Sequence, residues 1–494
     1  MAVVVALDAG TTGVRALAID EQSSIVALAY RELTQHYPQP GWVEHDLNEI
    51  WGHTQAVLDE LATRLDQPVA AIGITNQRET AAAWDRRTSA PRHKAIVWQD
   101  RRTAARCDQL TAEGRLDLVR STTGLVLDPY FTGTKYEWLL NEGGVAADDD
   151  LALGTIDSWL VWKLTDGAVH ATEPSNASRT MLFDINSLSW SPELADMLGV
   201  PMAALPEVRP TSGRFGTTAA GVSTIGAGIP ISGIAGDQQA ALFGQACFEA
   251  GMTKNTYGTG SFLLMNVGQT CPAPVEGLLT TVGWTLDESG PATYAYEGAI
   301  FVTGAAIQWL RDGLGIIDSA PEIGPLAASV PDTGGVYLVP AFAGLGSPWW
   351  DPYARGTIVG LTRGSGRAEI ARAVVEAMAY QTRDVLDAMA TASGQSLGDL
   401  RVDGGASVMD LLLQFQADQL GVTVSRPQNT ETTAVGAAYL AGLAEGVWGS
   451  LDDVSAAWAL DVAVSPSPDR TDADARYKKW LQAVERSRAW EDAD

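Results

Sequence analysis

One segment, residues 233–245, constrains this 494-residue chain most, because it joins an apolar strand to an apolar helix through a glycine-rich turn. The turn carries a single carboxylate, Asp237, between a strand expected at 229–234 and a helix expected to begin near Gln239. The free backbone N–H groups at the start of a helix favour an anion such as phosphate. A carboxylate beside such donors can deprotonate an alcohol next to a bound nucleotide, although an isolated aspartate here would more often only cap the helix.

Two further turns combine an acid with glycines after an apolar run, at residues 8–13 (DAGTTG) and 403–406 (DGGA). The first connects apolar runs at 3–7 and 14–20, so it is a hairpin and differs from the strand-to-helix loop of a P-loop. Three such turns, spread over both halves of the chain, predict two related halves that close on a nucleotide.

Apolar periodicity predicts strands alternating with helices in both halves, which indicates an α/β fold. We expect strands at 69–75, 95–98 and 400–406, a turn followed by a strand over 256–265, and helices at 48–65, 297–310, 370–389 and 433–443. Residues 394–398 match the G-x-S-x-G pattern of serine hydrolases, but they follow a helix and precede a strand, so we interpret them as a plain loop.

The composition limits the partners. The chain is 46% hydrophobic, enough for a large core and two domains, and its net charge is −27. Such a surface repels nucleic acid and anionic membranes, so a small-molecule substrate is expected. The three cysteines form no C-x-x-C pair and the five histidines have no metal-ligand spacing, which predicts a reduced cytoplasmic protein without a transition-metal site.

Four motifs carry a family resemblance. They are residues 7–13 (LDAGTTG), 73–80 (GITNQRET), 233–244 (GIAGDQQAALFG) and 344–356 (GLGSPWWDPYARG). They resemble the FGGY family of carbohydrate kinases, within the actin-like ATPase superfamily, and the second motif is typical of its glycerol-specific branch. The resemblance implies two actin-like (ribonuclease H-like) α/β domains, residues 1–252 and 253–494, with a nucleotide and substrate cleft between them.

The resemblance also implies an activity, the ATP-dependent phosphorylation of glycerol to sn-glycerol 3-phosphate in glycerol catabolism, with Asp237 as general base. ATP and Mg²⁺ would be the cofactors, and a homo-oligomer, dimer or tetramer, is expected. The polyol would be bound by Arg78, Glu79, Tyr130, Asp237 and Gln238, with Trp98 and Phe262 covering its carbon backbone. The phosphates and the nucleotide would be bound by Thr11, Thr12, Gly13, Arg15, Thr259, Gly304, Gln308, Gly405 and Met409. Asp8 and Asp237 would hold Mg²⁺ through water.

The residue chemistry agrees with these roles. Arg78 and Glu79 place a guanidinium donor beside a carboxylate acceptor, a pair that can hold two adjacent hydroxyls. Without the motif context, the pair would be interpreted as a surface ion pair, and Trp98 as core packing. The chain departs from the family pattern at Met409, where many members have Asn, and at Gly13, where Ser is usual.

Two other functions stay open at this point. One is a kinase for a tetritol or a sugar, since pocket length cannot be deduced from the sequence. The other is a non-catalytic, nucleotide-gated module, which the presence of Asp8, Asp237 and the Arg78–Glu79 pair together disfavours.

Overall fold

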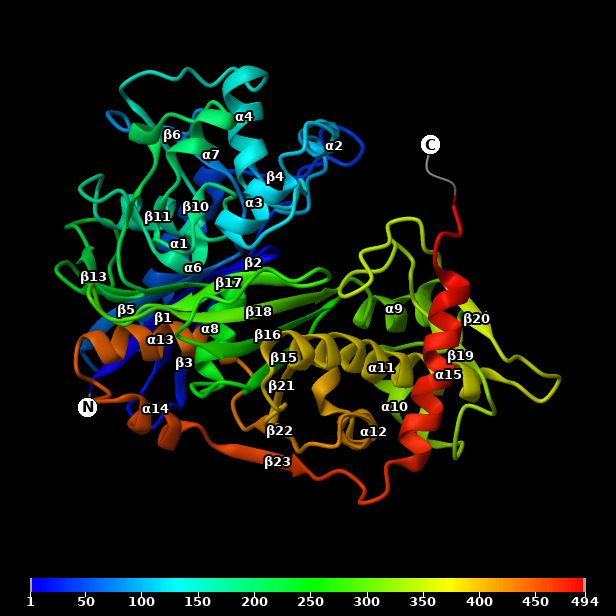
Figure 1. Cartoon of the computed structure of the whole chain (residues 1–494). Helices are drawn as coiled ribbons and strands as arrows, with labels where there is room; N and C mark the ends of the chain where they lie inside the picture. The colour runs from blue at the N-terminus through cyan, green and yellow to red at the C-terminus, as the bar shows by residue number, and fades with distance from the viewer. Residues whose placement is uncertain (1, 492–494) are drawn as a thin grey trace.

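The computed structural model describes residues 2–491, and two large mixed sheets organise the chain (Figure 1). The first sheet has the order β13 (Ser212–Thr217), β14 (Pro230–Gly236), β5 (Val69–Asn76), β1 (Val3–Ala9), β2 (Gly13–Ile19), β3 (Ile25–Glu32). The second has the order β17 (Leu279–Trp284), β18 (Thr293–Ile300), β16 (Ser261–Gly268), β15 (Thr253–Tyr257), β21 (Leu400–Gly404), β22 (Val424–Pro427), β23 (Leu460–Val464).

The two sheets repeat one pattern of strand pairing. In the first, β3, β2 and β1 pair antiparallel, β1, β5 and β14 pair parallel, and β13 closes the edge antiparallel. In the second, β18, β16 and β15 pair antiparallel, β15, β21 and β22 pair parallel, and β23 closes the edge antiparallel. The two halves predicted from the repeated acid–glycine turns therefore share a topology, and the α/β fold class is confirmed.

Most expected elements are present, including the hairpin of β1 and β2 and the helices α1 (Leu47–Ala62), α8 (Asp237–Gly244), α11 (Arg367–Ser393) and α13 (Thr432–Ala444). Residues 394–398 lie in a loop after α11, as expected. The helix predicted over 297–310 is wrong, because strand β18 runs to Ile300 and the helix α9 (Gly304–Asp312) begins only at Gly304. All eight residues of β18 are buried, so the strand has no polar alternation to distinguish it from a buried helix.

Helix α13, rich in small residues, packs backbone to backbone on the first sheet although it comes late in the chain (orange in Figure 1). A Cβ added to Gly73 of β5 would lie 2.1 Å from the Ala437 oxygen, and one on Gly233 of β14 would lie 2.3 Å from the Ala441 nitrogen. A Cβ on Gly436 of α13 would lie 1.8 Å from the Ala240 oxygen of α8. Only glycine permits these approaches. Strands β5 and β14 and helices α8 and α13 therefore form one tightly packed unit.

Other helices cover the remaining faces. Helices α1 and α5 (Ile156–Leu164) pack on the face of the first sheet opposite α13, and α11 and α12 (Asp410–Leu420) pack against the second sheet. The segment between β5 and β13 forms the upper lobe in Figure 1 and contains, besides α5, β6 (Ala82–Asp85), β7 (Ala95–Ile96), α2 (Ala104–Ala112), α3 (Leu116–Thr123), α4 (Gly133–Asn141), β8 (Leu151–Gly154), β9 (Ala171–Thr172), α6 (Pro174–Ala177), β10 (Phe183–Asp184), β11 (Ser189–Trp190), α7 (Pro192–Met197) and β12 (Glu207–Val208). The remaining α-helices and strands are β4 (Glu44–His45), α10 (Ile323–Ala328), β19 (Tyr337–Val339), β20 (Thr357–Val359), α14 (Leu451–Ala457) and α15 (Thr471–Ser487).

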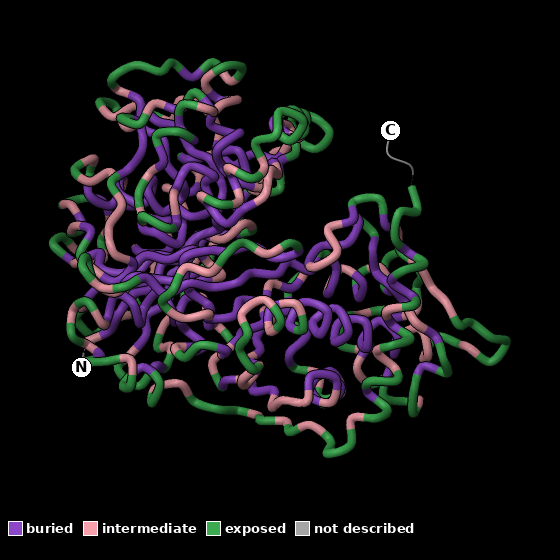
Figure 2. The backbone as a smooth tube through the Cα atoms, in the orientation of Figure 1, coloured by how far each residue is buried: buried purple, intermediate pink, exposed green. Residues whose placement is uncertain are grey.

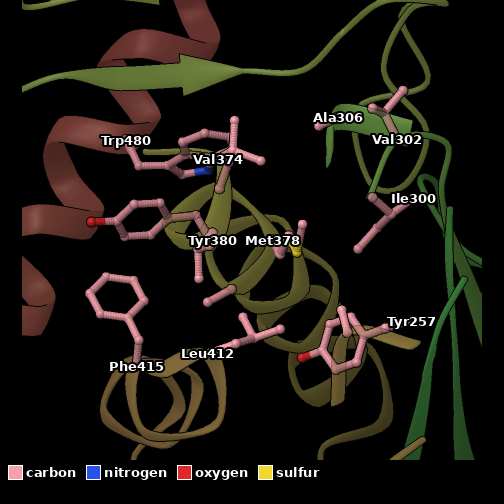
Figure 3. Packing of buried hydrophobic residues seen from close by; sticks show 14 of the residues in the cluster. Tyr257, Ile300, Val302, Ala306, Val374, Met378, Tyr380, Leu412, Phe415 and Trp480 are labelled. Carbon is pink, nitrogen blue, oxygen red and sulfur yellow. The ribbon is translucent and has the colours of Figure 1, made fainter. Parts of the chain in front are cut away.

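Burial is greatest in the two sheets and the helices between them, and exposed residues follow the loops (Figure 2). In the second half, Tyr380 of α11 stacks on Trp480 of α15 with centroids 5.2 Å apart, and meets Phe415 of α12 edge-on at 5.4 Å (Figure 3). These rings fasten α15 to the domain core. No helix in the described range 2–491 is long and apolar enough to span a membrane.

Candidate active site

Three parallel strands bring the principal candidate residues to one edge of the first sheet. Strands β1, β5 and β14 are neighbours, and Thr75 of β5 pairs with both Asp8 of β1 and Ala235 of β14. The carboxyl ends of parallel strands are where α/β proteins place ligands. Asp8, the Arg78–Glu79 pair and Asp237 therefore converge there, from segments far apart in the sequence.

Arg78 is the centre of this convergence. Its Nε lies 3.2 Å from the Asp237 Oδ1 and 3.7 Å from the Glu79 Oε1, and its Nη2 donates to the Tyr130 hydroxyl at 3.3 Å. Both Arg78 and Glu79 are buried, at 2% and 1% exposure, so the interpretation of the pair as a surface ion pair is wrong. Glu79 has a φ of 60°, a left-handed conformation that non-glycine residues rarely adopt and that tends to occur at functional sites.

The second half of the chain contributes a carboxylate that the sequence analysis missed. Glu297 of β18 accepts from Arg78 Nη1 at 2.5 Å and Nη2 at 3.1 Å, in a bidentate pair. Arg179, also missed, donates its Nε to Glu79 at 2.6 Å and its Nη2 to Glu297 at 2.9 Å. The buried ion pairs of Arg78 and Arg179 with Glu297 connect the first sheet to the second, next to the predicted polyol residues.

The pKa values of the buried charged groups in this cluster depend on two opposing effects, burial and ion pairing. Burial raises the pKa of Glu297, but Arg179 and Arg78 outweigh it and lower the pKa to about 2. Burial lowers the pKa of Arg78, but Glu297 and Glu79 outweigh it and raise the pKa well above its ordinary value. Asp237 differs, since burial by its surroundings raises its pKa against the opposing effects of Arg78 and Lys254. Its side chain keeps 31% exposure, so its carboxylate is open to the solvent side of the cluster.

Aromatic side chains border the same cluster. The rings of Trp98 and Tyr130 meet edge-on with centroids 5.6 Å apart, and the Trp98 Nε1 donates to the Thr11 Oγ1 at 2.9 Å. Trp98 therefore connects the predicted polyol residues to the hairpin of β1 and β2 rather than filling a core. Phe262 pairs with Ala299, two residues beyond Glu297 on β18, so alternation places Phe262 and Glu297 on the same face of the second sheet.

The hairpin residues lie beside Asp8. The backbone N–H of Gly10 bonds to the Gly13 oxygen at 3.0 Å and closes the turn that holds Thr11 and Thr12. Packing favours glycine at position 13, because a Cβ there would lie 2.4 Å from the Tyr30 ring and 2.6 Å from the Arg31 backbone oxygen. A serine at position 13 would therefore require both the Tyr30 ring and the backbone at Arg31 to move.

Arg15 is neutralised by two carboxylates. Its Nε lies 2.7 Å from the Asp8 Oδ2, and its Nη1 bonds to Glu431, which immediately precedes α13. Burial raises the pKa of Asp8, and Arg15 acts in the opposite direction.

A cavity of about 670 Å³ brings together the five residues expected around the nucleotide. Its lining includes Thr259, Gly304, Gln308, Gly405 and Met409. A Cβ on Gly405 would meet no atom of residues 2–491 within 4 Å, and the φ of Gly405 is not positive, so neither packing in this range nor backbone conformation requires glycine at 405. Met409 lies near Gly324 of α10, where its thioether contributes to an apolar wall.

Lys254 of β15 is a further residue that the sequence analysis missed. It is fully buried, and its Nζ donates to the Gln238 Oε1 and, at 3.0 Å, to the Thr256 Oγ1. Burial lowers the pKa of Lys254 to about 8, while Asp403 and Asp237 act to raise it. Its bond to Gln238 leaves the Gln238 amide nitrogen free to donate elsewhere.

The carboxylates suit a weakly coordinated hard cation. In the part of the chain that the structure describes, residues 2–491, no group of three His, Cys, Asp or Glu side chains could hold a metal. Mg²⁺ is commonly bound by only one or two carboxylates together with water and phosphate oxygens, so Asp8 and Asp237 fit that donor set.

Two family models match the chain, the N-terminal domain of the FGGY family of carbohydrate kinases over residues 3–244 and its C-terminal domain over residues 253–445. The chain belongs to the FGGY family of carbohydrate kinases. It is 56% identical to the glycerol kinases of Dechloromonas aromatica and Carboxydothermus hydrogenoformans, in each case over 99% of this chain and 98% of the relative.

Solved structures agree with this assignment. A crystal structure of Plasmodium falciparum glycerol kinase with ADP superimposes with a TM-score of 0.94 at 34% identity, over 99% of this chain and 98% of that one. A xylulose kinase from Lactobacillus acidophilus has a TM-score of 0.89 at 20% identity over 98% of this chain and 97% of that one, which shows a common fold.

The residues missed in this FGGY kinase had weak signals in the sequence. Lys254 stands four residues before the turn at 258–260, and Glu297 is a lone charge within an otherwise uncharged strand. A lone acid in a buried strand needs a buried cation as partner, and that rule could have directed attention to Glu297.

Proposed function

We propose that the chain transfers the γ-phosphoryl group of ATP to glycerol and gives sn-glycerol 3-phosphate. The observation that carries the proposal is the buried Arg78, whose guanidinium contacts both Glu79 and the partly exposed Asp237. A donor and an acceptor for hydroxyls thus adjoin a carboxylate able to take a proton. The full-length similarity to proteins named glycerol kinase supports glycerol as the polyol.

Each polyol residue has a proposed part. Arg78 and Glu79 hold two adjacent hydroxyls, Tyr130 and the free amide nitrogen of Gln238 add hydrogen bonds, and Trp98 and Phe262 cover the carbon chain. Glu297 and Arg179 fix Arg78 and Glu79 from behind, which keeps the pair in one orientation without direct contact with glycerol.

Asp237 acts as general base. Burial raises its pKa, which makes the carboxylate a better proton acceptor than an ordinary aspartate. As the terminal hydroxyl oxygen bonds to the γ-phosphorus, the hydroxyl proton passes to Asp237. The bond from phosphorus to the β,γ-bridging oxygen breaks, and its electron pair leaves with ADP.

The nucleotide occupies the cavity of about 670 Å³ in this proposal. Gly405 permits close approach of the ligand, which explains a glycine that packing does not require. Thr259, Gly304, Gln308 and Met409 line the remainder, and Thr11, Thr12, Gly13 and Arg15 meet the phosphates from the first sheet. Asp8 and Asp237 would hold Mg²⁺ through water, and the ion would offset phosphate charge.

A coupled ADP-release assay with a panel of polyols and sugars tests the proposal. We expect ATP consumption that depends on glycerol and exceeds that with tetritols, xylulose and gluconate. ATP hydrolysis that is equal with and without every polyol would contradict it, as would a sugar preferred over glycerol. The proposed dimer or tetramer is tested by light scattering after size exclusion, and the proposed cytoplasmic location by cell fractionation.

A further inference from the structure

Lys254 lies at the junction of the two proposed ligand sites. Its Nζ bonds to Gln238, the residue after Asp237, and to Thr256 of β15. Thr256 precedes the cavity-lining residues Tyr257, the last of β15, and Thr259, in the turn that follows. In the parallel pairing of β15 with β21, Thr256 is opposite Asp403. Lys254 therefore adjoins residues of both proposed sites.

The ammonium group has an unused donor. Lysine carries three N–H bonds, and the hydrogen bonds found among residues 2–491 use two of them, to Gln238 and Thr256. The side chain is fully buried, so bulk water does not readily solvate the remaining N–H. A buried donor without an acceptor is costly, and a ligand oxygen would remove that cost.

Lys254 also differs from the three arginines Arg15, Arg78 and Arg179 in its partners. Arg15 has carboxylates within 4.0 Å in Asp8 and Glu431, and Arg179 has them in Glu79 and Glu297. Arg78 has three such carboxylates. Within the described range of the chain, Lys254 alone of these four cations has no carboxylate oxygen within 4.0 Å. Its positive charge is therefore the least neutralised of the four.

We propose that Lys254 is a catalytic residue that donates its third N–H to the phosphoryl group during transfer. The proposal rests on the kinase function proposed above. Charge spreads over the three equatorial oxygens of the phosphoryl group in a loose transition state, and a fixed donor in a buried site stabilises it. The covalent changes stay as written for that reaction: the glycerol oxygen bonds to phosphorus, ADP leaves with the electron pair, Asp237 takes the proton, and Lys254 keeps all of its protons.

The first experiment replaces the charge and keeps the length of the side chain. Lys254→Met should lower kcat roughly 10²–10³-fold, as the loss of one such donor does, while the dissociation constants of glycerol and ADP change less than about threefold. Calorimetry measures the binding of both ligands to the folded variant. Lys163→Met is the matched control, because Lys163 lies over the Trp51 and Trp159 rings and makes no contact with the cluster; its kcat should equal that of the wild type.

The second experiment separates a catalytic from a structural role. Lys254→Ala leaves room for a small amine, and propylammonium should restore part of kcat in a saturable manner, whereas propanol should not. A purely structural cross-link between Gln238 and Thr256 would lower stability and glycerol affinity, without rescue specific to the ammonium.

Normal kcat in Lys254→Met overturns the proposal, and so does a loss that appears mainly as weaker glycerol binding without rescue of Lys254→Ala by propylammonium. If Lys254→Ala fails to fold, Lys254→Met alone decides between the two roles. A loss of kcat much larger than the loss of ligand affinity supports the catalytic role, and the reverse overturns it. A wild-type protein without glycerol-dependent turnover would instead refute the proposed function.

Discussion

Removal of the Glu297 charge should lower the free energy of unfolding by a predictable amount, because Glu297 forms the ion pairs between the two sheets. Glu297 is fully buried and accepts two hydrogen bonds from Arg78 and one from Arg179. Its pKa falls from an ordinary 4.5 to about 2, which at about 1.4 kcal/mol per pH unit corresponds to roughly 3 kcal/mol of folding free energy. This agrees with the roughly 3–5 kcal/mol lost when one partner of a buried ion pair is removed.

The sign of the pH dependence follows from the direction of that change. A carboxyl group whose pKa is lowered by folding contributes stability that is fully present above its unfolded pKa and is lost as the pH falls toward 2. Glu297→Gln should therefore lose the same roughly 3 kcal/mol of unfolding free energy at pH 7 and at pH 6, because both lie above 4.5.

Urea denaturation followed by tryptophan fluorescence measures the effect, with Glu376→Gln as the matched control. Glu376 is also a buried partner of an arginine, Arg372 at 2.8 Å, but burial raises its pKa, so a neutral isostere should cost much less there. A loss below about 1 kcal/mol in Glu297→Gln at pH 7, or an equal loss in both variants, would refute the reasoning.

Three further predictions follow from the site. Asp237→Asn should keep the fold and glycerol affinity but reduce kcat roughly 10²–10⁴-fold, and calorimetry with steady-state rates checks both; turnover within a few-fold of wild type would contradict the base assignment. Arg78→Ala should weaken glycerol binding by about 1.5–3 kcal/mol and leave ATP affinity nearly unchanged, and equal losses for both ligands would mean that Arg78 is misassigned. Glycerol and a non-hydrolysable nucleotide together should reduce the radius of gyration in small-angle scattering, because closure excludes water from the reaction; an unchanged radius would count against a moving cleft.

The sequence predicted those parts of the site that depend on local patterns. Asp8 and Asp237 belong to acid–glycine turns at strand ends, and the Arg78–Glu79 pair follows the end of a strand, so all of them lie at one edge, where parallel strands present their carboxyl ends together. The five residues expected around the nucleotide line one cavity. Gly304, Gly405 and Met409 lie at the start of a helix or directly before one, Thr259 lies in the turn between β15 and β16, and Gln308 lies within α9.

The remainder of the cluster could not be predicted because it depends on contacts across the chain. Glu297 meets Arg78 across 219 residues, and neither position has a local pattern that names the other. The error over 297–310 hid this contact further, since a helix there would not place Glu297 in the second sheet, next to the strand that carries Phe262. Lys254 is similar, because its role depends on which acceptors surround it after folding.

The location of the ion pairs limits how the two halves can move. Arg78 and Arg179 belong to the first half of the chain and Glu297 belongs to the second, and all three side chains are buried. A motion that separated the two halves here would leave these charges without their partners, at a cost of several kcal/mol. Strands β5 and β14 are also locked to α13 by glycine contacts. The pivot of any closure should therefore lie at this cluster, and the nucleotide cavity bordered by α9 and α10 should move toward it. On this argument glycerol alone binds to a preassembled pocket, and the nucleotide supplies most of the change in radius.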